Sequence, residues 1–282
     1  MNNKKVWLVT GASKGLGLAL TLKLLAEGYA VAGTSRDGKA LAATVDHSSF
    51  LPLEVSITQE VSVQQAIDAT IARFGRIDVL VNNAGYGHFG TLEELSDEES
   101  RQNFDINVFG SLNVIRKVMP HFRAQGSGHI FNISSIGGYT ANFAGWGIYC
   151  ATKFAVAGFT EALAEESKAF GVKATVVYPG YFRTEFLSGD SMIVPRHPIA
   201  AYETARASQA LHQQEINGNQ AGDPDKAAAV LIEVAKTAEA PVHLFLGQDA
   251  YERVALKMDI IQKDMAAWSK QATATAFQES MA

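Results

Sequence analysis

The sequence has a single cysteine, Cys150, among its 282 residues. One cysteine cannot form a disulfide within the chain. The seven histidines are scattered, with neither an HExxH motif nor a Cys/His cluster at metal-ligand spacing. The sequence therefore predicts no disulfide framework and no metal site, and Cys150 is interpreted as a small packing residue without a redox role.

Long apolar runs and a strong charge imbalance are also missing. No stretch approaches the roughly 18 apolar residues of a membrane-spanning helix. The 24 basic and 29 acidic residues leave a net charge of −5, which argues against a nucleic-acid surface and a polybasic membrane anchor. The start, MNNKKVWLVTGA, has lysines before an apolar run, but that run is too short for a signal peptide. We expect a globular, cytoplasmic protein.

Short β-branched runs alternate with longer helical patterns, which is typical of βαβ units and a parallel sheet. The predicted fold is α/β, a doubly wound parallel sheet (Rossmann fold) forming a single domain over 1–282 with a C-terminal helical extension. Strands are predicted at 6–10, 29–35, 50–55, 77–82, 129–134, 173–178 and 242–247, and helices at 16–26, 59–73, 97–123, 149–169 and 223–238.

Two segments break this alternation. Residues 185–222 form a long connection with little periodicity, and such connections are usually lids or binding loops, so we expect the substrate-binding loop here. A C-terminal helix is predicted at 248–280. Its apolar stripe either packs on its own domain or forms a subunit interface or part of the substrate wall. The stripe consists of Tyr251, Val254, Met258, Ile261, Met265 and Trp268.

A glycine-rich turn, TGASKGLG, joins the first predicted strand to the first predicted helix. Glycines there let the backbone turn tightly and approach a pyrophosphate, whose charge meets the free amides of the helix start. Because this turn lies at the start of a βαβ series, it is a candidate dinucleotide-binding site. The candidate residues are Gly11, Ser13, Lys14, Gly15, Leu16 and Gly17.

The end of the second strand bears on the choice of dinucleotide. NAD enzymes usually have an acidic residue there for the ribose 2′-hydroxyl, whereas an arginine accommodates a 2′-phosphate. Here the strand ends in Thr34-Ser35-Arg36, and Lys14 adds a second cation, although Asp37 follows directly. The sequence favours NADP(H).

Tyr149 and Lys153, in the stretch YCATK, are four residues apart and would share one helix face. The spacing alone is weak evidence. In order along the chain, however, TGASKGLG, NNAG at 82–85, Asn107, Ser135 and this pair resemble the short-chain dehydrogenase/reductase family, in its single-domain, NADP-preferring branch. The resemblance is strong from residue 4 to about 190 and weaker to Gly247. The C-terminal helix and loop more loosely resemble members that act on retinol-type or steroid-type alcohols and ketones.

This resemblance implies a set of cofactor contacts. Asn82, Ala84 and Gly85 would form the adenosine-side wall, and Lys153 would bond the nicotinamide ribose. The resemblance also places the PGYFRT segment near the nicotinamide carboxamide. The residues of this segment are Pro179, Gly180, Phe182 and Thr184. The usual aspartate near the adenine is replaced by Glu54, before Val55. From Ser135 to Tyr149 is one residue more than the family pattern, which leaves Ser134 as an alternative active serine.

Reduction of a ketone needs a hydride donor and a proton donor at the carbonyl oxygen, and Tyr149 can be that acid. A nearby ammonium would lower the phenol pKa from about 10, by up to about three units at 4 Å. Ser135 would hold the substrate oxygen. By family likeness Asn107 would bend its helix and hold a water that relays protons to Lys153.

The predicted function is hydride transfer between NADP(H) and a ketone, aldehyde or secondary alcohol. A sugar-nucleotide epimerase or dehydratase and a non-catalytic dinucleotide sensor are the alternatives. We expect a small-molecule substrate and a homo-oligomer (dimer or tetramer), with a monomer left open. Aromatic residues suggest an apolar pocket, with His88 interpreted as a residue at its rim. These are Tyr86, Phe89, Tyr139, Phe143, Trp146 and Tyr181.

Overall fold

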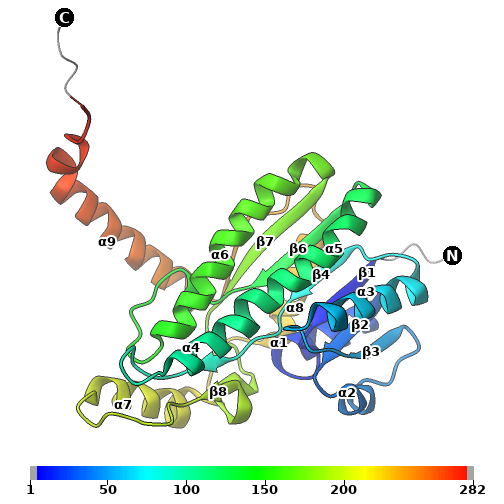
Figure 1. The fold of residues 1–282 in the computed structure, drawn as a ribbon, viewed down its shortest axis with the longest axis horizontal. Coiled ribbons are helices and arrows are strands. Elements are labelled where there is room, and N and C mark those ends of the chain that lie inside the picture. Colours follow the sequence, from blue (N-terminus) through cyan, green and yellow to red (C-terminus); the bar gives the residue numbers. More distant parts are fainter. Residues whose placement is uncertain (1–4, 278–282) are drawn as a thin grey trace, which may run out of the picture.

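The computed structural model describes residues 5–277, which form a parallel sheet of seven strands with helices on both faces (Figure 1). The strand order is β3-β2-β1-β4-β6-β7-β9, and every neighbouring pair is parallel. The strands are β1 (Val6–Thr10), β2 (Ala30–Ser35), β3 (Phe50–Glu54), β4 (Val79–Asn82), β6 (Gly128–Ile133), β7 (Val172–Pro179) and β9 (His243–Leu246). The predicted Rossmann-like α/β fold is confirmed.

The strand order reverses at β1. The chain first adds β2 and β3 on one side of β1, and then crosses to add β4 and the later strands on the other side. Leu8, at the centre of β1, is therefore paired with Ala32 on one side and Leu80 on the other. At such a reversal the connections leave in opposite directions, so a crevice opens at the carboxyl ends of the two central strands.

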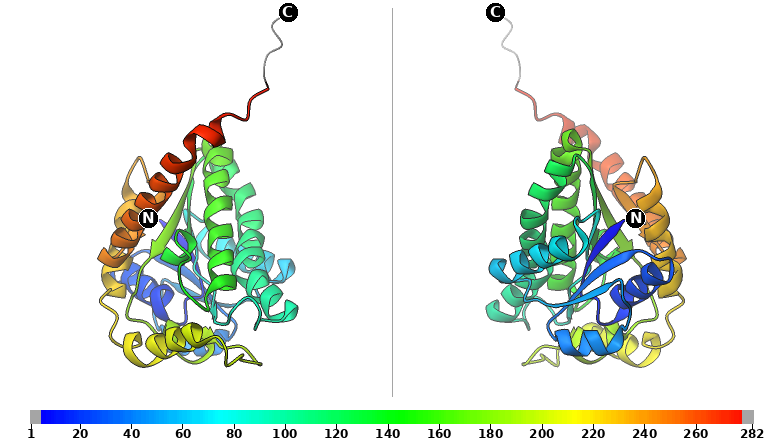
Figure 2. Two further views of the ribbon diagram at one scale, coloured as in Figure 1. Left: turned by 90° about the vertical axis from the view of Figure 1, so that its left-hand side faces the viewer. Right: turned by 90° about the vertical axis from the view of Figure 1, so that its right-hand side faces the viewer.

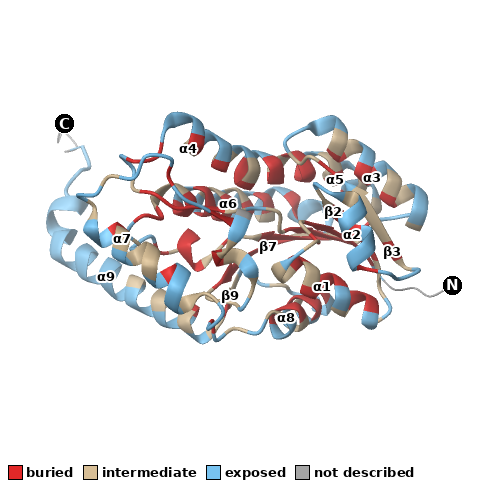
Figure 3. Ribbon diagram, turned by 90° about the horizontal axis from the view of Figure 1, so that it is seen from below, coloured by how far each residue is buried: buried red, intermediate tan, exposed pale blue. Residues whose placement is uncertain are grey.

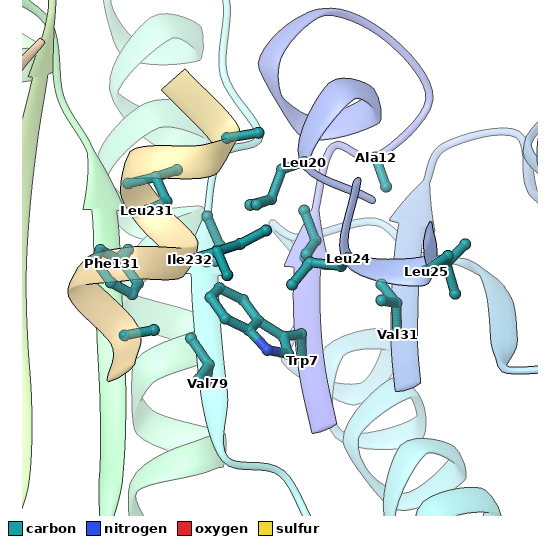
Figure 4. Close-up of a cluster of buried hydrophobic side chains, with 14 of the residues drawn as sticks. Trp7, Ala12, Leu20, Leu24, Leu25, Val31, Val79, Phe131, Leu231 and Ile232 are labelled. Atoms are coloured by element: carbon teal, nitrogen blue, oxygen red, sulfur yellow. The ribbon is translucent and has the colours of Figure 1, made fainter. Parts of the chain in front are cut away.

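Two layers of helices cover the sheet (Figure 2). On one face, α1 (Gly15–Ala26) and α8 (Pro224–Lys236) bury leucine and isoleucine side chains around Trp7 of β1 (Figure 4). On the other face, α3 (Glu60–Phe74), α5 (Ser111–Gln125) and α6 (Gly147–Ser167) pack on Leu8 and Leu80. Strands buried on both faces need near-continuous apolar sequence, which explains runs such as VWLVT.

The predicted helix over 97–123 is present but interrupted. It consists of α4 (Asp97–Phe104), a π-helical segment η1 (Asp105–Gly110) and α5. A Ser96/Glu99 capping box fixes the start of α4. π-Helical turns are rare and expose backbone groups that a regular helix would pair, and they often occur at functional sites. The predicted bend at Asn107 is therefore a change of helix type.

Several short elements were not predicted. Asp37 caps the start of α2 (Gly38–Thr44) by accepting a hydrogen bond from the Ala40 amide. Two strands, β5 (Gly87–His88) and β8 (Met192–Ile193), form a separate parallel pair. The 185–222 connection also contains α7 (Glu203–Ala210) and a second π-helical segment, η6 (Leu211–Ile216).

The C-terminal helix is present as α9 (Gln248–Thr273), and residues 278–280 of the prediction lie outside the described residues. The interpretation that its apolar stripe packs on its own domain is wrong. Beyond Ala250 and a few half-buried residues, the helix leaves the body of the molecule and is exposed (Figures 1 and 3). Within residues 5–277, no helix combines the length and the apolar character needed to cross a membrane.

A buried histidine in the sheet makes stability depend on pH. His129 Nε2 lies 2.9 Å from Thr175 Oγ1, whose own proton goes to the carbonyl of Pro241, so Nε2–H must donate. Its Nδ1 has no partner among the described residues. Burial, with Lys173 and Lys5 nearby, lowers the pKa of His129 to about 3. A second proton on this ring would have no acceptor.

We therefore predict that acid selectively destabilises the wild type relative to His129→Gln. Below about pH 6.5, His129 binds a proton in the unfolded chain but not in the folded chain, so the free energy of unfolding falls as pH falls. Between pH 7 and 5 this linkage costs about 2 kcal/mol. Urea unfolding at the two pH values measures it, with the exposed His197→Gln as control. Equal losses in wild type and His129→Gln would contradict the assignment.

Candidate active site

A cleft of about 670 Å³ opens at the carboxyl ends of the central strands. It brings together residues from the glycine turn, the end of β2, the NNAG segment, the end of β6, the start of α6 and the PGYFRT segment. The predicted site residues that line it are Gly11, Ser13, Lys14, Gly15, Leu16, Arg36, Val55, Ala84, Gly85, Ser135, Tyr149, Lys153, Pro179, Gly180, Phe182 and Thr184.

The glycine turn has the shape that a phosphate-binding turn needs. Gly11 and Gly15 have φ of +67° and +58°, a region that glycine adopts without strain. A Cβ on Gly17 would lie 2.2 Å from the Gly11 carbonyl oxygen, so only glycine lets α1 start this close to the turn. No side chain caps the amides at the start of α1, and its first turn has no acidic residue. These amides are free to bind an anion.

Two cations border the cleft at the end of β2. Arg36 and Lys14 both line it, and neither has an ion-pair partner within residues 5–277. Asp37, which could have favoured a ribose hydroxyl, instead uses its carboxylate to cap α2. The charge facing this end of the cleft is therefore positive.

Three of the predicted cofactor-binding residues lie outside the cleft. Gly17 lets the start of α1 pack closely against the Gly11 carbonyl. Asn82 is buried and donates hydrogen bonds to Asn132 Oδ1 (2.9 Å) and the Ser111 carbonyl, so it ties β4 to β6 and α5. Glu54 is exposed, and its Oε2 accepts from the Gly38 amide at the start of α2. The side chains of Asn82 and Glu54 thus form hydrogen bonds with neighbouring secondary structure.

Asn107 is buried in the π-helical segment, behind the cleft wall. Its Oδ1 accepts from the Tyr86 amide, and its Nδ2 donates to the Tyr86 carbonyl and to Thr152 Oγ1, each at 3.0 Å. Thr152 in turn donates to the Tyr149 carbonyl at 2.7 Å. The amide thus joins the NNAG segment to the start of α6. Its role in a water relay stays a prediction.

Tyr149 and Lys153 lie one turn apart on α6 and are both buried, with Lys153 Nζ 5.8 Å from the centre of the Tyr149 ring. The Lys153 ammonium donates to the Ile133 carbonyl at 2.9 Å. Ser135, just beyond β6, accepts from the Gly137 amide and interacts with the Tyr149 hydroxyl. Ser134 instead turns away and donates to the Lys153 carbonyl at 2.8 Å, so geometry favours Ser135 as the active serine.

Burial dominates the titration of this pair. It raises the pKa of Tyr149 above its ordinary value, and the hydrogen bond with Ser135 offsets only part of this effect. Burial also lowers the pKa of Lys153 to about 8. The expected lowering of the phenol pKa by Lys153 is therefore not found, because the loss of hydration on burial is the largest effect on Tyr149. Tyr149 therefore carries its proton at pH 7 and can donate it.

The described part of the chain has no group of three or more His, Cys, Asp or Glu side chains that could hold a metal ion. Cys150 is buried, and burial raises the pKa of its thiol to about 12. A thiol held in this form is a poor nucleophile, which agrees with a packing role.

Comparisons with known proteins agree with this geometry. The family model for short chain dehydrogenases matches residues 5–191. The chain is 33% identical to oxidoreductase BOA17 of Botryotinia fuckeliana over 275 residues, which are 96% of this chain and 99% of that protein. A 3-ketodihydrosphingosine reductase of Bacteroides thetaiotaomicron is 37% identical over 216 residues, 76% of this chain and 78% of that protein. A short-chain dehydrogenase structure from Streptomyces avermitilis superposes with a TM-score of 0.88 at 35% identity, covering 98% of this chain and 100% of that chain.

The chain belongs to the short-chain dehydrogenase family. It is accordingly an oxidoreductase that binds a nicotinamide dinucleotide. Members with solved structures bind either NAD or NADP, so the family alone does not decide between them.

In this short-chain dehydrogenase, part of the cleft wall comes from the segment that sequence patterns left unresolved. Of the predicted aromatic residues, Tyr86, Phe143, Trp146 and Tyr181 line the cleft. Phe89 does not line the cleft but packs behind its wall against Trp146, and Tyr139 packs against Tyr178 and Phe245. His88 is also not at the rim, because it lies buried in β5 with Glu99 as its nearest charge. Wall residues that were not predicted include Phe186, Leu187, Ile193, His212 and Gln220.

His212 and Gln220 carry polar groups to this wall. His212 Nδ1 donates to the Ser208 carbonyl at 2.7 Å, so its Nε2 accepts from the Tyr181 hydroxyl at 2.9 Å. Gln220 is buried, and its Oε1 has no partner among residues 5–277. No sequence signal indicated either residue, because their positions depend on the path of the whole 185–222 connection.

A buried ion pair holds this connection over the cleft. Arg206 of α7 reaches both carboxylate oxygens of Glu94 at 2.8 Å, and Glu94 also accepts from the amides of Thr91 and Ile199. The Glu94 side chain is fully buried. Burial alone would raise the pKa of Glu94. The hydrogen bonds from Thr91 and Ile199 and the charge of Arg206 outweigh this effect and hold the pKa below its ordinary value.

We predict that Arg206→Met destabilises the protein by about 3 kcal/mol, because it leaves the Glu94 carboxylate buried without its cation. The same change should raise KM for substrate more than KM for cofactor, since α7 leads directly into the segment with His212 and Gln220, which line the cleft. Thermal unfolding and steady-state kinetics measure both effects. Arg101→Met, which removes an exposed ion pair with Asp97, is the control and should change neither quantity. Equal behaviour of the two variants would contradict this role.

Proposed function

We propose that this short-chain dehydrogenase transfers a hydride between NADP(H) and a ketone, aldehyde or secondary alcohol, with Tyr149 as the general acid and base. One observation carries the proposal. The uncapped glycine turn, the two unpaired cations and the Ser135, Tyr149 and Lys153 side chains all face a single cleft.

The residues present fit a nicotinamide dinucleotide. The free amides of the glycine turn suit its pyrophosphate, and Thr184, the N-cap of a short helical turn, lines the cleft beside Gly15. When bound, the cofactor supplies or accepts the hydride. Lys153, at the base of the cleft, would hold the nicotinamide ribose, and Pro179, Gly180 and Phe182 would flank the ring.

The chain itself handles the proton. The Tyr149 phenol keeps its proton at neutral pH because of burial, so it can donate to the oxygen of a carbonyl as negative charge develops there. Ser135 would donate a second hydrogen bond to the same oxygen and fix its position. In the oxidative direction the pair works in reverse, and the positive charge of Lys153 stabilises the tyrosinate.

NADP(H) rather than NAD(H) is favoured by the charge at the end of β2. Arg36 and Lys14 have no competing partner within the described residues, whereas the nearest carboxylate, Asp37, is occupied at α2. A 2′-phosphate with close to two negative charges would gain two charge-assisted contacts there. A ribose hydroxyl would find no acidic acceptor in the usual place.

An apolar carbonyl substrate is favoured by the side chains around Tyr149. The rings of Trp146 and Phe186 lie 5.5 and 5.7 Å from the Tyr149 ring. The similarity to a 3-ketodihydrosphingosine reductase points the same way. We retain residues 185–222 as the substrate-binding loop, a cytoplasmic location, and a homo-oligomer. Exposed Phe109 and Phe154 lie on the η1 and α6 segments, which family likeness would pair across a dimer.

We predict that Tyr149→Phe lowers kcat at least a hundredfold while NADPH still binds, because only the proton donor is lost. Turnover of a panel of ketones and aldehydes is followed by NADPH absorbance, and binding is followed by titration. Tyr139→Phe is the control, since Tyr139 packs against Tyr178 and Phe245 outside the cleft. Wild-type turnover in Tyr149→Phe would refute the role. No turnover by the wild type on any substrate would favour the sensor.

We also predict that Arg36→Ala weakens NADPH binding about tenfold or more and leaves NADH binding nearly unchanged, because the arginine contacts only the 2′-phosphate. Lys14→Ala should act in the same direction. The control is Lys39→Ala, which removes the same charge from exposed α2 outside the cleft. Tighter binding of NADH than NADPH by the wild type would overturn the cofactor assignment.

A further inference from the structure

Helix α9 keeps its apolar stripe in solvent along most of its 26 residues. Tyr251, Met258, Ile261, Met265 and Trp268 are between 41% and 68% exposed. A helix of this length gains little stability from backbone hydrogen bonds alone, and most helical stability in proteins comes from packing an apolar face. Side chains of this size on one stripe indicate a partner.

The spacing of the stripe identifies the kind of partner. From Tyr251 to Trp268 its members follow at steps of 3, 4, 3, 4 and 3, which is the seam of a two-stranded coiled coil. We propose that α9 pairs antiparallel with α9 of a second copy of this chain. In an antiparallel pair related by a two-fold axis, the same surface faces itself, so each contact occurs twice.

One register of the pair fills the whole seam. Placing Met258 beside the partner's Ile261 also sets Val254 beside the partner's Met265 and Tyr251 beside the partner's Trp268. Each layer then joins an apolar residue to an apolar residue, and large rings close both ends. Because α9 projects from the body, the two bodies lie at opposite ends of the pair (Figure 1).

Charge complementarity supports this orientation. In the antiparallel register Lys257 faces the partner's Asp264 across the edge of the seam, twice by symmetry. Neither side chain forms an ion pair within residues 5–277, whereas Lys263 and Asp259, on the outer face, pair with each other. In a parallel pair Lys257 would face the partner's Gln262, and no ion pair would form.

A membrane surface fits α9 less well. Helices that bind anionic lipid are rich in basic residues on their polar face. Along α9 the acidic and basic side chains balance, with Asp249, Glu252, Asp259 and Asp264 against Arg253, Lys257, Lys263 and Lys270. Such a mixed pattern is typical of helix pairs that select a partner by charge.

Sedimentation of the full chain at micromolar concentration tests the proposal. Met265→Glu places a charge in the seam and should halve the assembled mass, while the rest of the fold is retained. The matched control is Leu256→Glu, an equal change at an equally exposed position of α9 that lies off the seam. This variant should sediment like the wild type. A monomeric wild type, or equal behaviour of the two variants, would overturn the proposal.

Charge exchange tests the antiparallel orientation. Lys257→Glu and Asp264→Lys should each raise the dissociation constant about tenfold, and the double variant should restore it. Failure of the double variant to recover would overturn the antiparallel register. Flotation with anionic phospholipid vesicles is the last comparison. Vesicle binding by the wild type that Met265→Glu abolishes, without self-association at any concentration, would assign the stripe to a membrane instead.

Discussion

The site depends on a small hydrogen-bond network between β1 and the segment that follows β4. Asn83 donates from Nδ2 to the carbonyls of Thr10 and Gly11, at 3.0 and 2.9 Å, while Thr10 Oγ1 accepts from the amides of Asn83 and Ala84. These bonds join the two strands that flank the crevice at the point where the strand order reverses. They fix the glycine turn relative to NNAG, so the phosphate end and the catalytic end of the cleft share one rigid base.

The electrostatics of the catalytic pair illustrate how burial and charge compete. A single ammonium near a phenol would favour tyrosinate in a partly solvated site. Here the loss of hydration is the larger effect for both groups, and it keeps Tyr149 protonated while making the Lys153 ammonium easier to deprotonate. The Ile133 carbonyl, at the end of β6, compensates by holding the ammonium directly. Burial thus sets the protonation of the pair, and the backbone of the sheet fixes where the ammonium lies.

Most of the fold could be predicted because buried parallel strands require distinctive apolar runs, such as VWLVT and the run ending at Asn82. The ordered motifs also placed Tyr149, Lys153 and Ser135 around one cleft. Patterns could not show that Asn82 and Glu54 bond to neighbouring elements, or that a regular helix becomes π-helical around Asn107. His212 and Gln220 were beyond prediction, because a segment without periodicity takes its path from long-range contacts such as Glu94 with Arg206.

The contact between Glu94 and Arg206 has a consequence for how ligands enter. One carboxylate gathers donors from α7, from the Ile199 amide and from the Thr91 turn. Moving α7 away while Glu94 stays in place would leave its carboxylate buried without its cation, which is costly. The part of the 185–222 connection that is held by Glu94 should therefore move as one cooperative unit. Ligand exchange would then follow the rate of a single all-or-none opening rather than the flexibility of individual loops.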